Sequence, residues 1–296
     1  MEYYNYHDVN FRGSIDRVYY KTTNKDGEER EKYVNVYLPK NYDQNDTNKK
    51  YDILYLMHGG GGNPDAWLDC SKIKNMLDYM IDQEIINPLI VAFPSYYKEK
   101  ISRIGEVNPN EERFNVLFFQ KELGEEMIPA VETKYHTYAK DCSKTDLKES
   151  RWHRAFGGFS MGSCTTWFAL LNHLDEIATF LPLSGDCWEI EPLGGKKDPK
   201  ETAKRMYQII SENGWKASDF KIFAATGTED PAFLAMAPMI DVLKEYIDLF
   251  NYSDDFATGN LHYFVADKEI HAYETVYHYV YNYLPYLFGP AVNGEK

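Results

Sequence analysis

The amino-acid sequence predicts an α/β fold with a mostly parallel central sheet, antiparallel strands at its N-terminal end and helices on both faces. Three observations lead to this prediction. Apolar, strand-like runs alternate with helix-like segments from residue 51 onward. The first two predicted strands instead alternate polar and apolar residues, as half-buried antiparallel strands do. Neither a linker nor an internal repeat divides the chain, so residues 1–296 are predicted to form a single domain.

The composition narrows the classes of function. At 296 residues the chain is long enough to bury a sizeable core, and 44% of its residues are hydrophobic. Its formal net charge of −14 argues against nucleic acid and anionic membranes as partners, because both would repel it. No apolar run approaches the roughly 20 residues of a membrane span, and no signal-peptide pattern opens the chain. We therefore expect neither a nucleic-acid-binding nor a membrane-spanning protein.

Aromatic and cysteine residues add two further constraints. The 25 tyrosines offer apolar faces with polar tips, which suit contact with sugars or phenolic rings. The cysteines lack paired Cys-x-x-Cys spacing, so no metal site is expected. Their pairing stays open, although a disulfide between two of them is possible if the strand ends that carry Cys164 and Cys187 are neighbours. The four cysteines are Cys70, Cys142, Cys164 and Cys187.

The N-terminal half is predicted to start with a hairpin. Residues 14–22 and 31–39 are its strands, and residues 24–27 are the turn, in which Gly27 supplies positive φ. Residues 51–57 are largely apolar and suit the interior of a sheet. Helix and strand then alternate, with a helix at 71–83, a strand at 88–93 and a helical pattern at 115–135 that is kinked at Pro129.

Residues 95–113 form a long polar segment without periodicity. Loops of this length are uncommon unless they are functional. We interpret the segment as a candidate wall of a substrate cleft, and whether it moves as a lid stays open.

The C-terminal half continues the alternation of strands and helices. Residues 189–200 are interpreted as an inserted loop. Gly214 is interpreted as the residue that ends the helix predicted at 202–213. The predicted strands are 151–156, 179–183, 220–226 and 261–266, and the predicted helices are 163–171, 202–213, 239–250 and 273–288.

The most informative motif is Gly158-Phe159-Ser160-Met161-Gly162, which reads G-x-S-x-G between a predicted strand and a predicted helix. A serine hydroxyl attacks a carbonyl only if it projects clear of the backbone, and this requires a tight, strained turn. Glycines on both sides let the strand and the helix approach closely. The motif therefore predicts Ser160 as a catalytic nucleophile.

A run of four glycines, residues 59–62, follows His58 directly after the strand 51–57. Consecutive glycines cost conformational entropy, so this position indicates a need for bare backbone N–H groups. We interpret Gly60 or Gly61 as one half of an oxyanion hole, and the N–H of Met161 as the other half. His58 is interpreted as an orienting hydrogen-bonding residue rather than a base.

An activated serine needs a base, and the base needs an orienting carboxylate. Ser160, Asp230 and His271 occur in the order Ser, Asp, His, and each follows the carboxyl end of a predicted strand. That edge is where open α/β sheets bind their ligands. Asp186 also follows a strand and is kept as the alternative acid.

An aromatic wall is expected beside this site. Trp67 and Trp188 are candidate substrate-binding residues, and Asp186 is a third candidate next to Trp188. Filling of the core is the competing interpretation for each tryptophan.

With these motifs and Leu183-Ser184-Gly185-Asp186, residues 14–288 resemble a feruloyl esterase. The chain is similar to the esterase-D-like branch of α/β-hydrolases, which includes the first carbohydrate esterase family, acetyl xylan esterases and bacterial mycolyltransferases. The resemblance implies an α/β-hydrolase domain without a cofactor. It also implies Ser160 as nucleophile, Asp230 as acid, His271 as base, and the N–H groups of Met161 and Gly60 in the oxyanion hole.

The activity that the resemblance implies is hydrolysis of feruloyl or p-coumaroyl esters on plant arabinoxylan. Such enzymes are commonly secreted and are often part of multidomain cellulolytic enzymes, so an extracellular location and a multidomain parent are expectations. Two other functions stay open. One is an acetyl esterase, thioester hydrolase or acyltransferase with the same triad, and the other is a carbohydrate-binding module on an inactive hydrolase scaffold.

Overall fold

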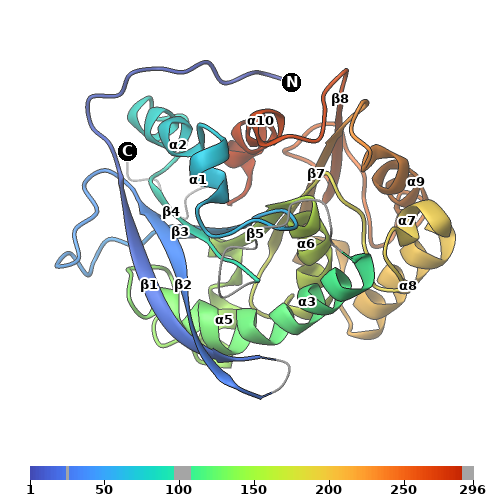
Figure 1. Cartoon of the computed structure of the whole chain (residues 1–296), viewed down its shortest axis with the longest axis horizontal. Coiled ribbons are helices and arrows are strands. Elements are labelled where there is room, and N and C mark those ends of the chain that lie inside the picture. Colours follow the sequence, from blue (N-terminus) through green and yellow to red (C-terminus); the bar gives the residue numbers. More distant parts are fainter. Residues whose placement is uncertain (25–26, 97–107, 289–296) are drawn as a thin grey trace.

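The computed structural model describes residues 1–24, 27–96 and 108–288. Within these residues, eight strands form one sheet in the order β1-β2-β4-β3-β5-β6-β7-β8 (Figure 1). β1 (Ser14–Thr23) and β2 (Glu29–Leu38) are antiparallel to each other, and β2 is antiparallel to β4. The remaining neighbours are parallel: β4 (Leu89–Phe93), β3 (Asp52–Met57), β5 (Arg154–Phe159), β6 (Thr179–Leu183), β7 (Lys221–Gly227) and β8 (Leu261–Ala266). This is the fold class that the sequence predicts.

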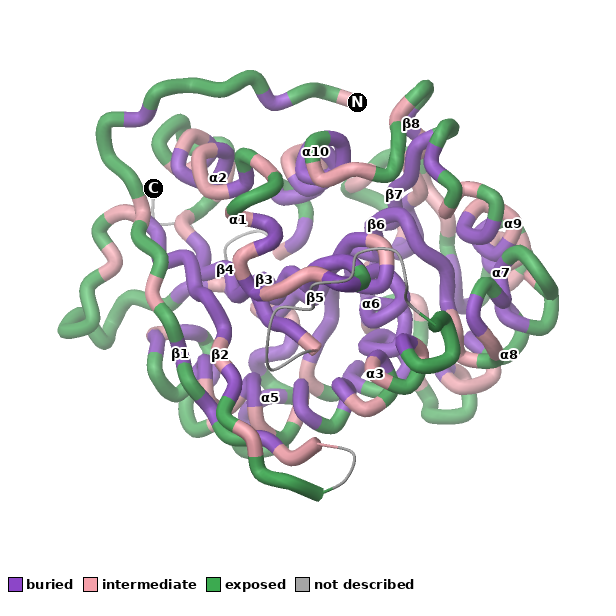
Figure 2. The backbone as a smooth tube through the Cα atoms, in the orientation of Figure 1, coloured by how far each residue is buried: buried purple, intermediate pink, exposed green. Residues whose placement is uncertain are grey.

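The sheet separates two hydrophobic cores, because successive side chains of a strand point to opposite faces. In β3, Ile53, Tyr55 and Met57 pack into one core, whereas Leu54 and Leu56 pack into the other. All of these side chains are buried, and the central strands are buried along their length in Figure 2. Burial on both faces explains why these strands read as continuous apolar runs rather than as alternating ones.

Helices cover both faces of the sheet (Figure 1). One core is closed by α1 (Ala66–Cys70), α2 (Ile73–Asp82) and α10 (Tyr273–Tyr283). The other is closed by α3 (Pro109–Glu122), α4 (Ile128–Glu132), α5 (Lys144–Glu149), α6 (Met161–Asn172), α8 (Pro199–Glu212) and α9 (Phe233–Leu243), with the short α7 (Gly194–Lys197) beside α9. None of the helices among the described residues is both long and apolar enough to cross a membrane.

The helix predicted at 115–135 begins earlier and changes its winding. Asn108 caps it by accepting a hydrogen bond from the N–H of Asn110, and Pro109 occupies the first turn, where its missing N–H costs nothing. The chain then makes a π-helical turn at Leu123–Met127 before α4, so the expected irregularity near Pro129 is a widened turn. Residues 97–107 of the predicted wall at 95–113 lie outside the described residues. The last residues of this segment, from Pro109 onward, belong to α3.

Other boundaries also differ from the prediction. The helix predicted at 239–250 is α9 at Phe233–Leu243, because Met236, Met239 and Ile240 bury one helix face completely despite Pro238 within the helix. The predicted loop 189–200 contains α7 and the start of α8, where the Asp198 side chain accepts a hydrogen bond from the N–H of Glu201. Residues Arg151–His153 form a 3-10 turn instead of the start of a strand.

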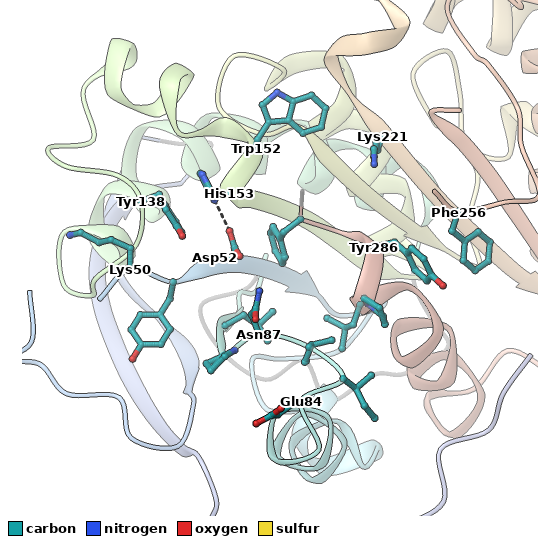
Figure 3. A pocket seen from close by; sticks show the side chains of 18 of the residues that line it. Lys50, Asp52, Glu84, Asn87, Tyr138, Trp152, His153, Lys221, Phe256 and Tyr286 are labelled. Carbon is teal, nitrogen blue, oxygen red and sulfur yellow. Dashed lines mark hydrogen bonds and ion pairs between the residues drawn. The ribbon is translucent and has the colours of Figure 1, made fainter. Parts of the chain in front are cut away.

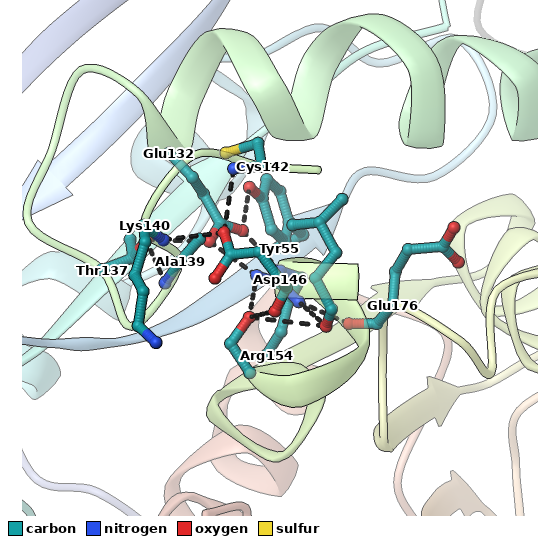
Figure 4. Close-up of polar contacts among 11 residues, drawn as sticks. Tyr55, Glu132, Thr137, Ala139, Lys140, Cys142, Asp146, Arg154 and Glu176 are labelled. Carbon is teal, nitrogen blue, oxygen red and sulfur yellow. Dashed lines mark hydrogen bonds and ion pairs between the residues drawn. The ribbon is translucent and has the colours of Figure 1, made fainter. Parts of the chain in front are cut away.

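A buried ion pair fixes the start of β5 (Figure 4). The side chains of Arg154 and Glu132 are 1% and 0% exposed, and Arg154 Nη2 donates to Glu132 Oε2 at 2.8 Å. Tyr55 donates to the same carboxylate at 3.0 Å, and Arg154 also donates to the carbonyl of Glu176. The pair thus joins β5 to β3 and α4, on the strand that leads to Ser160.

Cys164 and Cys187 are both free thiols, so the possible disulfide between them is absent. Both of these residues are buried, and burial raises the pKa of each thiol. Cys187, in the loop that follows β6, is part of one hydrophobic core.

Candidate active site

Ser160 lies in the sharp turn between β5 and α6. Its φ of 59° and ψ of −116° are rare for a residue with a Cβ, and its N–H donates to the carbonyl of Leu183 at 2.9 Å. A Cβ on Gly158 would lie 2.6 Å from the backbone of Gly162, and a Cβ on Gly162 would lie 2.6 Å from the carbonyl of Met57. The two glycines are therefore required by the close approach of strand and helix, as the motif predicts.

His271 and Asp230 lie on the loops after β8 and β7 and meet at Ser160. His271 Nε2 is 2.8 Å from Ser160 Oγ, and His271 Nδ1 is 2.8 Å from Asp230 Oδ1. The two loops touch at Gly227, where a Cβ would lie 2.1 Å from the carbonyl oxygen of Glu269. Three side chains that are distant in sequence are thereby brought to one edge of the sheet.

This arrangement fixes the direction of proton transfer. The carboxylate of Asp230 accepts a hydrogen bond, so Nδ1 of His271 carries a hydrogen and Nε2 is left to accept the proton of Ser160. Asp230 is 2% exposed, whereas the side chain of His271 is 33% exposed and within reach of water. The geometry is that of a serine activated by an oriented imidazole.

Asp186, the alternative acid, makes different contacts. Its Oδ1 accepts a hydrogen bond from Nε1 of Trp188 at 3.0 Å, and its Oδ2 accepts one from the N–H of Gly195 at 2.8 Å. Burial raises the pKa of Asp186 to about 6, and these two hydrogen bonds oppose the shift. The carboxylate that pairs with His271 is that of Asp230.

A cavity of about 410 Å³ opens beside Ser160 and is lined mainly by apolar side chains. Ser160, Gly60 and His271 lie along it with Trp188, which is half-buried. The apolar lining consists of Pro109, Met161, Cys164, Leu193, Pro231, Ala232, Leu234 and Ala235. A pocket of this kind suits an apolar or aromatic group held next to the nucleophile.

Two predicted site residues lie outside this cavity. Trp67 is 1% exposed, its Nε1 donates to the carbonyl of Met57, and its ring packs edge-on against Tyr273. The expected aromatic wall therefore excludes Trp67, because this indole satisfies its N–H at the end of β3 and fills the core. Gly61 is buried with φ of +72°, whereas Gly60 is exposed and lines the cavity. Of the two glycines, Gly60 is the one placed to meet a substrate.

Several side chains that the sequence did not single out shape the site. Tyr273 accepts a hydrogen bond from the N–H of Gly59, and Arg113 of α3 donates to the carbonyl of Trp188 at 2.6 Å. Phe159 packs against the imidazole of His271, with 4.5 Å between ring centroids. The position of Phe159, directly before Ser160 in G-x-S-x-G, could have identified it as a site residue. Arg113 and Tyr273 are brought to the site by tertiary packing, and no sequence motif identifies them.

The larger cavity shown in Figure 3, of about 1020 Å³, lies at the opposite edge of the sheet. It surrounds the N-terminal ends of β3 and β5, where His153 Nδ1 pairs with Asp52 at 2.7 Å and the ring of Tyr138 stacks on His153. None of its described lining residues is a serine, threonine or cysteine. We therefore place the candidate active site in the smaller cavity, which contains Ser160. Among the described residues, no three His, Cys, Asp or Glu side chains are grouped to hold a metal ion.

His58 lies beneath the glycine run and is 1% exposed. Its Nδ1 is 2.6 Å from the carbonyl oxygen of Gly59, and its Nε2 is 2.8 Å from Ser95 Oγ. Burial, together with the nearby charge of Lys32, lowers the pKa of His58 to about 4. The imidazole is thus neutral near pH 7, which agrees with an orienting role.

The buried imidazole makes stability depend on pH. Because the pKa of His58 is 6.5 when exposed and about 4 when folded, the unfolded chain takes up the proton first as the pH falls. We expect this contribution to be complete above pH 6.5 and to fall by about 3 kcal/mol on acidification to pH 4. Urea unfolding at a series of pH values measures it. His58→Asn, which does not titrate, should lose this part of the slope, and an unchanged slope in that variant would contradict the assignment.

Comparison with known proteins agrees with this fold. The family described as "Putative esterase" matches residues 28–274. Endo-1,4-beta-xylanase Y from Acetivibrio thermocellus is 38% identical over 258 residues, which are 87% of this chain and 22% of the relative. The chain thus spans about a fifth of the length of the curated relatives it matches.

Two solved structures are similar to this chain over its whole length. One described as FAE is 35% identical with a TM-score of 0.82, and the match covers 100% of this chain and 96% of the other. A serine-to-alanine mutant of the feruloyl esterase module from Clostridium thermocellum, complexed with sinapinate, is 34% identical with a TM-score of 0.80. That match covers 100% of this chain and 99% of the module. The chain belongs to the esterase family, in its feruloyl esterase branch.

Proposed function

We propose that this chain is a serine esterase that hydrolyses feruloyl and p-coumaroyl esters on plant arabinoxylan. The observation that carries the proposal is the 2.8 Å contact between Ser160 Oγ and His271 Nε2 at the mouth of an apolar cavity. The hydroxycinnamoyl group is supported by the relatives, one of which is a feruloyl esterase module complexed with sinapinate. The xylan backbone is supported by the match to a xylanase chain.

The reaction proceeds in two halves. His271 takes the proton of Ser160 as Oγ attacks the ester carbonyl, and the N–H groups of Met161 and Gly60 stabilise the oxyanion that forms. His271 then gives the proton to the sugar oxygen as its bond to the acyl carbon breaks, so the sugar leaves with a hydroxyl and a feruloyl-enzyme remains. Water activated by His271 attacks this acyl-enzyme and releases ferulate, while Asp230 stabilises the imidazolium in both halves.

The acyl group occupies the cavity. Trp188 supplies an aromatic face, and Leu193 and Leu234, which are 42% and 56% exposed, supply apolar contacts near the opening. Asp186 acts here through Trp188, because its carboxylate accepts the indole N–H and holds the ring in one orientation. This is the substrate-binding role that we assign to the pair.

Trp188→Ala tests the acyl pocket. We expect kcat/KM for methyl ferulate to fall by about 10-fold to 100-fold, while kcat/KM for p-nitrophenyl acetate changes by less than about 3-fold, because acetyl does not reach the indole. Trp152→Ala is the matched control, since Trp152 is also half-buried but lines the cavity at the opposite edge. Equal losses on both esters, or no loss on methyl ferulate, would contradict the feruloyl assignment.

The same assay decides the alternative function. An acetyl xylan esterase, or another small-acyl esterase or acyltransferase with this triad, would have a higher kcat/KM for p-nitrophenyl acetate than for methyl ferulate and would be indifferent to Trp188→Ala. We further propose that the chain acts outside the cell as a module of a multidomain xylan-degrading enzyme. The match to 22% of a xylanase supports this.

A further inference from the structure

Three hydrogen bonds hold the backbone of Gly59. Its carbonyl oxygen lies 2.6 Å from His58 Nδ1 and accepts from the N–H of Gly62 at 3.1 Å. Its N–H donates to the hydroxyl of Tyr273 at 3.0 Å. A carbonyl oxygen can only accept, so the hydrogen of the neutral imidazole lies on Nδ1, and Nε2 accepts from the hydroxyl of Ser95.

The direction of the Gly59 carbonyl determines the direction of the next N–H. The peptide unit between Gly59 and Gly60 is planar and trans, so its C=O and N–H point to opposite sides. The C=O points to the buried imidazole of His58. The N–H of Gly60 therefore points away from it, and Gly60 lines the cavity with Ser160 and Met161. A Cβ on Gly60 would lie 3.8 Å from the sulfur of Met161, so Gly60 is next to the residue that follows the nucleophile.

We propose that His58 is a positioning residue for the oxyanion hole: by binding the Gly59 carbonyl, it aims the Gly60 N–H at the oxygen of the reacting ester. The inference rests on the proposed hydrolysis of esters at Ser160 and does not depend on which acyl group is natural. Without His58, the N–H of Gly62 would hold this carbonyl within a flexible glycine run, and a rotated peptide would present a carbonyl oxygen to a developing negative charge.

A buried chain of polar groups holds His58 in turn. Ser95, which is 1% exposed, contacts Nε2 of His58 with its hydroxyl and accepts a hydrogen bond from Lys32 Nζ at 2.7 Å with its carbonyl. Lys32 pairs with Glu122 at 2.5 Å, and their side chains are 4% and 6% exposed. The anchor of the oxyanion loop thus extends to β2 and to the end of α3. A buried, fully paired chain of this kind restricts the imidazole to one rotamer.

Gly62 also helps to position the imidazole of His58. A Cβ at this position would lie 2.6 Å from Nδ1 of His58 and 3.1 Å from the carbonyl oxygen of Gly59. Glycine is therefore required at residue 62 so that the imidazole can lie close to the loop. Gly62→Ala should displace the imidazole without removing any hydrogen-bonding group.

Substitution of His58 by asparagine or glutamine separates its hydrogen bonds to Gly59 and Ser95. The amide nitrogen of asparagine occupies the position of Nδ1, so His58→Asn keeps a donor for the Gly59 carbonyl. The amide of glutamine reaches the position of Nε2, so His58→Gln keeps a partner for Ser95 and loses the contact with Gly59. We expect kcat to fall by about 10-fold to 100-fold in His58→Gln and in Gly62→Ala, and by less than about 5-fold in His58→Asn, with KM within about 3-fold throughout.

The readout that distinguishes positioning from stability is affinity for an arylboronic acid, which forms a tetrahedral adduct on the nucleophile. Its Ki should rise by the same factor as kcat falls, because both depend on the oxyanion donors. Ser95→Ala should show a smaller effect in the same direction. Ser150→Ala, which removes another buried hydroxyl, one that donates to the carbonyl of Asp146, should lower the melting temperature alone.

Both methyl ferulate and p-nitrophenyl acetate should be used, and the fold-changes should agree between them. Equal activity in His58→Asn and His58→Gln, or a folded Gly62→Ala with unchanged kcat and Ki, would overturn the proposal while Ser160 remained essential. Full activity in Ser160→Ala would instead overturn the proposed function. If His58→Gln fails to fold, Ser95→Ala and Gly62→Ala supply the same comparison.

Discussion

Replacing Ser160 with alanine is expected to lower kcat for methyl ferulate by about 10⁴-fold to 10⁶-fold. The loss is this large because the change removes the only hydroxyl within 2.8 Å of His271 Nε2 in the described residues, and with it the acyl-enzyme route. Steady-state hydrolysis at high enzyme concentration measures the residual rate. Substitution of Asp230 or His271 by alanine should lower kcat by a similar order, since the three groups act as a unit.

The fold of this variant should be unchanged. The N–H of Ser160 makes the hydrogen bond to Leu183, and this bond does not involve the side chain. Alanine at φ of 59° is strained to the same degree as serine, so no new backbone strain is added. Circular dichroism and retained binding of ferulate serve as controls. Residual hydrolysis within 10-fold of wild type, in a folded variant, would refute the assignment of Ser160.

Arg154→Met is expected to destabilise the protein by about 3–5 kcal/mol. The change leaves the carboxylate of Glu132, which is 0% exposed in this ion pair, without its counter-charge in the core. It also removes the donor to the carbonyl of Glu176. The free energy of unfolding in urea measures the effect, and we expect a large fall in the midpoint.

Two variants control this measurement. The double substitution Arg154→Met with Glu132→Gln should recover part of the loss, because the stranded charge is removed. Lys148→Met breaks a pair with Asp175 at 2.7 Å in which both side chains are more than half exposed, and it should cost less than about 1 kcal/mol. A loss in Arg154→Met no larger than that in Lys148→Met would show that the buried pair does not stabilise the fold.

The positions of Ser160, Asp230 and His271 could be predicted because the chemistry leaves local signals. A nucleophile at the end of a strand needs flanking glycines, and those glycines appear in the sequence as G-x-S-x-G. The strands could also be predicted, since β6 and β8 have the predicted bounds. Apolar runs of five to seven residues are buried on both faces, and this burial requires their composition.

Features that depend on tertiary packing left no such signal. Trp67 and Trp188 are alike in the sequence, but one fills the core under the oxyanion loop and the other lines the cavity. The helix predicted at 239–250 lies instead at Phe233–Leu243, because apolar packing of α9 against α8 outweighs the hydrogen bond that Pro238 cannot make. The contact of Lys32 and Glu122 joins residues ninety positions apart, and periodicity reports nothing about pairs so distant.

Labelling with a fluorophosphonate tests the central claim most directly, because this reagent reacts with a serine only when an adjacent base and an oxyanion hole activate it. We predict a single phosphonyl adduct, located by peptide mass spectrometry on Ser160 and lost in His271→Ala. An adduct on a different residue, or no adduct in the folded wild-type protein, would contradict the account.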